Sequence, residues 1–212
     1  MHRNYKIKSQ KTLYGNILFR SILEARWAVF FDSMGIEYRY EPHCFDVETG
    51  GREVKYRPDF LLPELDIYIE IKPSKPYDIE NIKAAAWSKY MGDTMILFNL
   101  NPPRENFENG WKFTCDNQDK PPLLSKKYNW CECPKCGSVD ISELGQITSC
   151  GCYTIKDFNK MYETEVEKGI VISPNFEKTS RLLSAYKRSN KYSFKKNRND
   201  RVTKLSFQLD LF

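Results

Sequence analysis

Two carboxylates and one amine occupy alternating positions of a predicted β-hairpin. The run RPDFLLPELDIYIEIKP, residues 57–73, alternates apolar and polar side chains as two antiparallel strands do. A tight turn within residues 63–66 places Asp59 opposite Glu70, with β-carbons about 4.5–5.5 Å apart. Because side chains on a strand repeat every two residues, Lys72 is expected on the same face as Glu70.

This arrangement predicts a metal site suited to phosphodiester hydrolysis. Two carboxylates at that separation repel each other unless a cation lies between them, and a hard ion such as Mg²⁺ (or Mn²⁺) prefers oxygen ligands. Such an ion neutralises a phosphate and lowers the pKa of a bound water, while a lysine orients that water or stabilises developing charge. The alternative interpretation is a half-exposed hairpin with a surface ion pair between Glu70 and Lys72.

The elements around this hairpin predict an α/β fold. A capping-box pattern at Ser21 and a glycine stop at Gly35 indicate a helix over 21–35. Beyond residue 102 the chain turns polar and irregular, and Ser173-Pro174 is typical of the start of a helix that carries Phe176, Leu183 and Tyr186. The other expected elements are strands over 36–40, 45–47, 54–62, 67–72 and 95–100, and a helix over 78–90.

The sequence PDF at 58–60, followed by EIK at 70–72, resembles the split motif of the PD-(D/E)XK nucleases, the restriction-endonuclease-like superfamily. The expected order of helix, three strands, helix and strand over roughly residues 20–100 is similar to the core of that superfamily. The resemblance implies a mixed β-sheet flanked by helices, which we assign to residues 1–102.

The resemblance also implies a role for each charged residue. Asp59 and Glu70 would bind the metal, and Lys72 would assist the attacking water. Many members supply an acidic residue from the first helix, and Glu24 lies where it is expected, although it also fits the capping box. Arg57 and Tyr56 are expected to contact the scissile phosphate, and the alternative is that either one is a plain packing or surface residue.

Five of the seven cysteines lie between residues 131 and 152. The knuckle Cys-Pro-Lys-Cys-Gly and the later Cys-Gly-Cys supply four thiolates for a tetrahedral Zn²⁺, in a pattern that resembles a zinc ribbon. Cys-x-Cys replaces the more usual Cys-x-x-Cys, which leaves the part of Cys131 open. We assign residues 103–127 to a connecting segment and 128–158 to the ribbon, whose closed site predicts a structural role. The expected zinc ligands are Cys133, Cys136, Cys150 and Cys152.

Positive charge is concentrated in one segment. The chain has 33 Lys and Arg against 28 Asp and Glu, and nine of these basic residues lie between Arg181 and Lys204 with a single acid. Aromatic residues are interleaved with the cations, so residues 159–207 are expected to form a helical and basic DNA-binding arm. The alternative is a solvated tail. The residues expected to bind DNA are Arg57, Lys187, Arg188, Lys191, Lys195, Lys196 and Arg198.

The last five residues, QLDLF at 208–212, resemble the peptide by which bacterial polymerases and repair proteins dock on the replication sliding clamp. The resemblance implies that Gln208 forms hydrogen bonds and that Leu209, Leu211 and Phe212 supply the apolar contacts. The alternative is that these apolar side chains pack back on the core.

These patterns predict a metal-dependent DNA endonuclease from a bacterium, a bacteriophage or a mobile element, recruited to replication forks through a sliding clamp. A homodimer would help it to cut both strands. The alternatives are a transposon end-cleaving nuclease, a junction resolvase, and a catalytically silent adaptor that links DNA to a clamp. No run approaches the roughly 20 apolar residues that span a bilayer, and the first residues lack the apolar core of a secretory signal, so a cytoplasmic protein without membrane contacts is expected.

Overall fold

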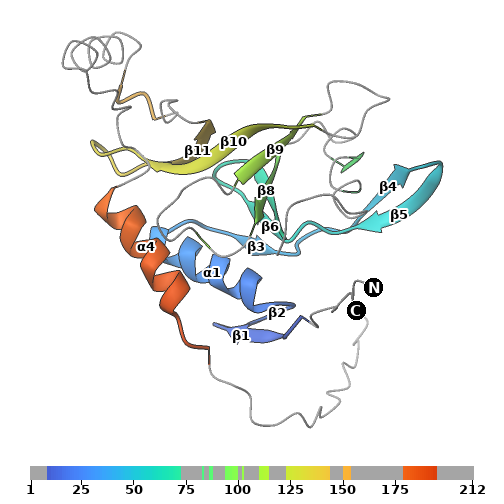
Figure 1. Cartoon of the computed structure of the whole chain (residues 1–212), viewed down its shortest axis with the longest axis horizontal. Coiled ribbons are helices and arrows are strands. Elements are labelled where there is room, and N and C mark those ends of the chain that lie inside the picture. The colour runs from blue at the N-terminus through green and yellow to red at the C-terminus, as the bar shows by residue number, and fades with distance from the viewer. Residues whose placement is uncertain are drawn as a thin grey trace, which may run out of the picture.

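The computed structural model describes residues 9–72, 83, 86–87, 94–99, 102, 110–114, 123–143, 150–153 and 179–194. In these parts, helices α1 and α4, a few residues of a further helix and eleven strands form an α/β fold (Figure 1). The helices are α1 (Ile22–Met34) and α4 (Ser180–Lys191). The strands are β1 (Thr12–Tyr14), β2 (Ile17–Phe19), β3 (Arg39–Tyr40), β4 (Phe45–Thr49), β5 (Arg52–Tyr56), β6 (Phe60–Leu62), β7 (Ile67–Lys72), β8 (Thr94–Asn99), β9 (Gly110–Thr114), β10 (Leu123–Glu132) and β11 (Val139–Glu143).

Helix α1 begins and ends where its sequence predicts. The Ser21 hydroxyl accepts a hydrogen bond from the backbone N–H of Glu24 at 3.1 Å and so caps the first turn. Gly35 ends the helix in the left-handed region, with φ of +65°, which a residue without Cβ adopts at little cost. Trp27, Phe30 and Phe31 have no exposed surface and face the sheet and α4.

A mixed seven-stranded sheet has the order β11-β10-β9-β8-β7-β6-β3. The register of β6 and β7 pairs Phe60 with Ile69 and Leu62 with Ile67, as the predicted turn requires. One step further along, the same register sets Asp59 against Glu70. Strand β8 runs parallel to β7 and occupies the middle of the sheet, as predicted for 95–100.

The two faces of this sheet bury different clusters. The alternate residues Phe60, Ile69 and Ile71 join the large core under α1. Tyr68 lies in a second cluster on the other side, with Trp87. Of the predicted helix over 78–90, the structure describes Lys83, Ala86 and Trp87, which are helical.

Two predicted elements differ from the observed ones. The strand expected over 54–62 is two strands, because β5 pairs with β4 in a separate hairpin and β6 joins the main sheet. The break falls at Arg57–Asp59, where Pro58 has no N–H for a ladder and the Asp59 carbonyl accepts from the N–H of Glu41 at 2.9 Å. Strand β9 and the first part of β10 lie in the segment 103–127, for which the sequence predicts no regular element.

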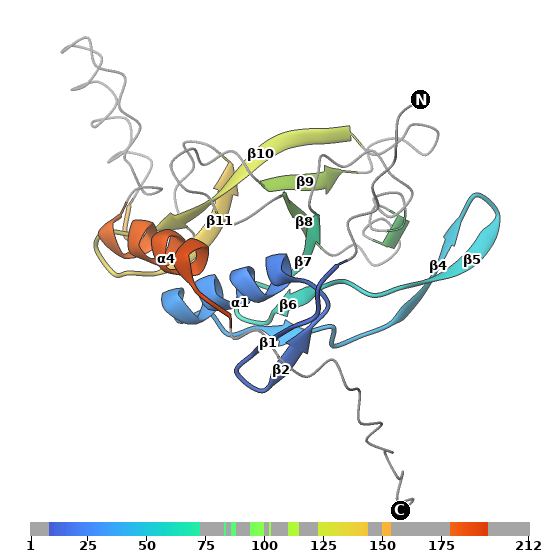
Figure 2. The same ribbon diagram turned by 60° about the horizontal axis from the view of Figure 1, so that its bottom comes forward.

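The strands on either side of the first cysteine pair belong to the main sheet. β10 pairs with both β11 and β9, so the predicted ribbon continues the sheet at one edge (Figure 2). Trp130 of β10 has 1% of its surface exposed and lies with its ring centre 5.3 Å from that of Phe30. The cysteine-bearing hairpin therefore shares its core with α1.

Helix α4 starts at Thr179, whose hydroxyl accepts from the N–H of Leu182 at 3.3 Å. The predicted start at Ser173-Pro174, with Phe176, lies outside the described residues. Tyr186 stacks on Phe30 of α1, with ring centres 5.0 Å apart and planes 8° from parallel. The part of the predicted basic arm that α4 covers, Ser180–Lys191, is therefore a helix packed on the core.

Helices α1 and α4 run in opposite directions side by side (Figures 1 and 2). The Arg181 side chain, at the start of α4, donates to the carbonyl of Met34 at the end of α1. At the other end of α4, the Tyr192 ring packs against the ring of Tyr14 in β1, with ring centres 5.2 Å apart. β2, the partner of β1, leads directly into the first turn of α1.

In the described residues, no helix has the length and apolar character needed to cross a membrane.

Candidate carboxylate site and cysteine centre

Asp59 lies buried at the start of β6, and both of its carboxylate oxygens have partners. Its exposed fraction is 2%. Oδ2 accepts a hydrogen bond from the backbone N–H of Ile71 at 2.7 Å, across the hairpin. Oδ1 lies 2.6 Å from Nη2 of Arg20, the residue before the N-cap of α1. The hairpin thus holds Asp59 in place, and a cation from α1's N-terminal side contacts it.

Glu70 and Lys72 form a buried pair on the adjacent strand. The ammonium nitrogen of Lys72 lies 2.6 Å from Oε1 of Glu70, and the exposed fraction is only 13% for the Lys72 side chain and 4% for that of Glu70. The alternative of a surface ion pair is therefore wrong. The hydroxyl of Tyr56 donates to Oε2 of Glu70 at 2.8 Å, so this tyrosine positions a carboxylate.

The electrostatics of the two carboxylates favour a cation beside them. Burial raises the pKa of Asp59 well above its ordinary range, and the negative charges of Glu70 and Glu24 raise it further. The Ile71 N–H and Arg20 oppose that shift without cancelling it. Burial also raises the pKa of Glu70, against the attraction of Lys72. Perturbed carboxylates of this kind are typical of functional sites.

Glu24 is buried close to the site but has its own partners. Its carboxylate accepts hydrogen bonds from the hydroxyls of Ser21 at 2.6 Å and Tyr40 at 2.5 Å, and from the N–H of Arg20 at 3.2 Å. Among the described residues, the four cysteines are the one group of three or more potential ligands close enough to share an ion. Glu24 therefore does not gather with Asp59 and Glu70 into a three-carboxylate shell in this structure.

Two residues beside the carboxylate site, Arg20 and Glu41, were not predicted. Besides Asp59, Arg20 contacts Glu41, whose Oε1 lies 2.6 Å from Nε of the arginine. Arg57 approaches the other Glu41 oxygen at 3.5 Å and is half exposed. Arg20 directly follows β2, so its position beside Asp59 depends on long-range packing that no local motif encodes. Glu41 has a positive φ of +45°, which a glutamate in the sequence does not predict.

The donor set of the carboxylate site suits a hard divalent ion in chemical type, because both acidic side chains offer oxygen. The cation that the structure places against Asp59 is the Arg20 guanidinium. Each of the four carboxylate oxygens of Asp59 and Glu70 already receives a hydrogen bond or ion pair. The structure thus shows a site that attracts positive charge, with side-chain cations supplying it.

The four cysteines expected to bind zinc converge on one point. Their sulfur atoms all lie within 4.8 Å of one another. Such spacing is compatible with a tetrahedral shell of Zn–S bonds of about 2.3 Å. Cys131 is not among them, and its thiol contacts the carbonyl of Asn129 at 3.7 Å. The gathered residues are Cys133, Cys136, Cys150 and Cys152.

Backbone hydrogen bonds shape the first half of this centre. The N–H of Gly137 donates to the Cys133 carbonyl, and the N–H of Cys133 donates to the Ser138 carbonyl, both at 2.8 Å. Gly137 has φ of +74°, which the tight turn requires. Lys135 joins the two halves, because its ammonium donates to the Cys152 carbonyl at 2.9 Å.

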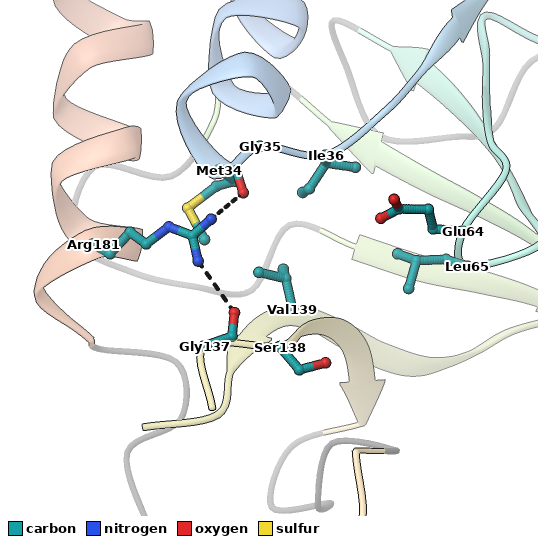
Figure 3. A pocket seen from close by; sticks show the side chains of 9 residues that line it. All are labelled: Met34, Gly35, Ile36, Glu64, Leu65, Gly137, Ser138, Val139 and Arg181. Carbon is teal, nitrogen blue, oxygen red and sulfur yellow. Dashed lines mark hydrogen bonds between the residues drawn. The ribbon is translucent and has the colours of Figure 1, made fainter. Parts of the chain in front are cut away.

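Arg181 fixes the knuckle to the end of α1 (Figure 3). Its guanidinium donates to the carbonyls of Met34 and, at 3.1 Å, of Gly137, and pairs with Glu132 at 2.9 Å. A cavity of about 290 Å³ opens beside these contacts, toward the β6–β7 turn. The cysteine centre is thereby attached to the helix whose other end borders the carboxylate site.

The predicted DNA-binding residues are only partly described. Lys187, Arg188 and Lys191 are exposed on α4, on the side that does not pack on α1. The other positions of the arm, and the whole C-terminal peptide, lie outside the described residues. These positions are Lys195, Lys196, Arg198, Gln208, Leu209, Leu211 and Phe212.

Comparisons with known proteins identify no family. No protein-family model and no curated protein matches the chain. Among solved structures, it is similar to one described as "Crystal structure of SSO0001", with 19% sequence identity and a TM-score of 0.30. That similarity covers 43% of this chain and 48% of the other, so the chain spans about half the length of that protein. This match carries no argument about function.

Proposed function

We propose that the protein is a metal-dependent DNA endonuclease with a restriction-endonuclease-like core and a structural zinc centre. One observation carries the proposal: a single hairpin sets Asp59 against Glu70 in a buried site and places Lys72 at 2.6 Å from one of these carboxylates. Two desolvated acids can hold a divalent ion, and a neighbouring amine can stabilise developing charge, so these groups suit metal-assisted phosphodiester hydrolysis.

The roles of the residues follow from their contacts. Asp59 and Glu70 would hold Mg²⁺ or Mn²⁺, which when bound supplies charge neutralisation and a water of lowered pKa. The Ile71 N–H holds the Asp59 carboxylate in place, and the Tyr56 hydroxyl holds that of Glu70. Lys72 is a donor that orients the attacking water or stabilises charge on the phosphate oxygens. Glu24 fixes the chain around Arg20, because it accepts from that residue's N–H.

The exposed face of α4 is the proposed DNA contact. Because α4 runs antiparallel to α1, its C-terminal end lies by the β1–β2 hairpin, which leads into the N-terminal end of α1 and the carboxylate site. Lys191 is the last residue of the helix, so the basic sequence continues beyond this end. We further propose that the QLDLF peptide binds a sliding clamp and that cutting of both strands uses a homodimer.

The cleavage experiment uses supercoiled plasmid with Mg²⁺ or Mn²⁺. We expect wild-type protein to cut, and Asp59→Asn and Glu70→Gln to lose at least about 100-fold in rate, because a buried metal ligand and its charge are removed. Asp46→Asn, which changes an exposed carboxylate on β4, is the matched control and should cut normally.

A wild-type protein that cuts neither plasmid nor forks and junctions would instead support the alternative of a DNA-binding adaptor. Equal cutting by all variants would show that the active site lies elsewhere. A transposon end-cleaving nuclease or a junction resolvase would show itself by a strong preference among the substrates.

The α4 contact predicts a salt-dependent affinity. Changing Lys187, Arg188 and Lys191 together to alanine is expected to lower the affinity for duplex DNA at least tenfold at about 0.1 M salt. The slope of log K against log salt should become less steep by about 2–3, because each phosphate contact contributes about 0.9 to that slope. Fluorescence anisotropy with a labelled duplex measures both. Lys55→Ala, an exposed cation on β5, is the control. An unchanged slope would exclude α4 from the interface.

A further inference from the structure

Arg20 lies on the solvent side of the carboxylate site, between the acidic residues Asp59 and Glu41. Its Nη2 is 2.6 Å from Asp59 Oδ1, and its Nε is 2.6 Å from Glu41 Oε1. The arginine side chain is 53% exposed, whereas that of Asp59 is 3% exposed. The guanidinium therefore covers a buried carboxylate from the solvent side.

The guanidinium and a divalent ion would compete for the same carboxylate oxygen. Oδ2 of Asp59 is directed at the N–H of Ile71, which leaves Oδ1 as the oxygen for a cation. Mg²⁺ binds oxygen at about 2.0–2.1 Å and requires near-octahedral geometry, so a second cation at the same oxygen both crowds and repels it. Binding of the ion to Asp59 is therefore expected to displace the half-exposed Arg20 side chain from Oδ1.

The structure provides a fixed base and a second partner for that movement. The backbone N–H of Arg20 is directed at Glu24 Oε2 and the Tyr40 hydroxyl oxygen, at 3.2 and 3.0 Å. Glu41 holds the Nε side of the guanidinium and also lies 3.5 Å from Arg57. An arginine that releases Asp59 therefore stays beside Glu41, next to a second guanidinium.

The backbone of Glu41 supports a functional role for this arrangement. Glu41 has φ of +45°, in the left-handed region that non-glycine residues adopt at a cost of about 1–3 kcal/mol. Its N–H donates to the Asp59 carbonyl at 2.9 Å, which ties it to the site. Strained residues persist where the surroundings hold them, and here the result is a carboxylate between two arginines.

We infer that Arg20 is a displaceable counter-cation of the carboxylate site, which pairs with Asp59 before a divalent ion binds and then pairs with the substrate phosphate beside Arg57. This inference rests on the proposed function, because it specifies how the same site receives metal and phosphodiester. Paired guanidiniums suit a phosphate group, since each offers planar donors to its oxygens.

The test measures Ca²⁺ and DNA binding separately, on zinc-loaded protein. Ca²⁺ takes the same oxygen ligands, so calorimetry with Ca²⁺ alone reports on the carboxylate site. Arg20→Ala and Arg20→Gln are expected to bind Ca²⁺ at least about tenfold more tightly than wild type, because a competing cation is lost. Both are expected to bind a DNA duplex at least about fivefold more weakly in the presence of Ca²⁺. Arg52→Ala, an exposed arginine of β5, is the control for net charge.

The inference predicts that Ca²⁺ affinity rises while DNA affinity falls in the Arg20 variants. A purely structural role of Arg20 would instead weaken both kinds of binding. Suppose that wild type binds Ca²⁺ and that Asp59→Asn abolishes this binding, so that the carboxylate site is the one measured. A Ca²⁺ affinity that is then unchanged or reduced in both Arg20 variants would overturn this inference but not the metal site. Ca²⁺ binding that appears only after Arg20 is replaced would support it. No Ca²⁺ binding by wild type or by either variant would overturn the inference and the metal site of the proposed function together.

Discussion

Replacing Cys133 by serine is expected to abolish zinc binding and to lower the free energy of unfolding by more than about 4 kcal/mol, because structural zinc sites contribute about 10–16 kcal/mol of apparent binding free energy in small domains. Cys133 has no exposed surface and directly follows β10, the strand that carries Trp130 into the core. The four sulfurs gather at the edge of the main sheet, so their loss loosens that sheet and the packing of α1.

Urea unfolding followed by circular dichroism, together with zinc content by mass spectrometry, measures both effects. Cys131→Ser is the matched control, since Cys131 is equally buried but lies outside the four-sulfur group. It should keep one zinc per chain and lose at most about 1–3 kcal/mol, the cost of burying a hydroxyl in place of a thiol. A Cys133→Ser protein that keeps its zinc or its wild-type unfolding midpoint would show that the centre does not stabilise this core.

The parts of the fold that local signals specify were predictable. Ser21 and Gly35 bound α1 because a cap and a left-handed glycine act within one turn of chain. The hairpin register followed from alternation and the short turn, so the opposition of Asp59 and Glu70 could be predicted before the structure. The four gathered cysteines were predictable for the same reason, because knuckle spacing is local.

The parts that long-range packing decides were not predictable. The sequence gives no sign that β10 and β11 continue the main sheet, because strand partners far apart in the chain leave no periodic pattern. A helix carrying Leu183 and Tyr186 was predicted, but its packing on α1 through Leu182, Ala185 and Tyr186 was not, because these side chains lie among cations that suggest a solvated face. Arg20 and Glu41 were missed because their roles arise only when α1 and the strands after it meet.

The position of Arg20 also changes how the carboxylate site is understood. The sequence predicts two acids that require a metal to coexist, whereas the structure shows them accompanied by Arg20 and Lys72. Arg20 and Lys72 thus offset part of the repulsion between the two acids, and the proposed role of Arg20 makes it a competitor for a divalent ion at Asp59. The raised pKa of Asp59 shows that this compensation is incomplete, since burial and the neighbouring acids outweigh a half-exposed arginine.

Asp59→Asn is therefore expected to stabilise the protein in zinc-loaded, Mg²⁺-free buffer at neutral pH, although it lowers the cleavage rate measured with Mg²⁺ at least about 100-fold. The raised pKa means that folded Asp59 retains its proton at a pH where the unfolded chain has released it. Its contribution to stability is present below the ordinary pKa of an aspartate, about 4, and is lost as pH rises through the folded value. Asparagine does not ionise, so the variant's advantage should be absent near pH 4 and grow as pH rises, reaching about 0.5–2 kcal/mol, the usual range for a stabilising change.

Urea unfolding of wild type and Asp59→Asn between pH 4 and 8 measures this difference. The control Asp46→Asn alters a carboxylate whose side chain is 48% exposed and should follow the wild-type curve within about 0.5 kcal/mol. An Asp59→Asn protein that is less stable than wild type by the same amount at every pH would show that the Arg20 ion pair, and not the buried negative charge, dominates the energetics of this site. A stability gain that disappears when Mg²⁺ is added would mean that the ion stabilises the wild-type carboxylate, because a ligand that binds only the folded state stabilises it by mass action.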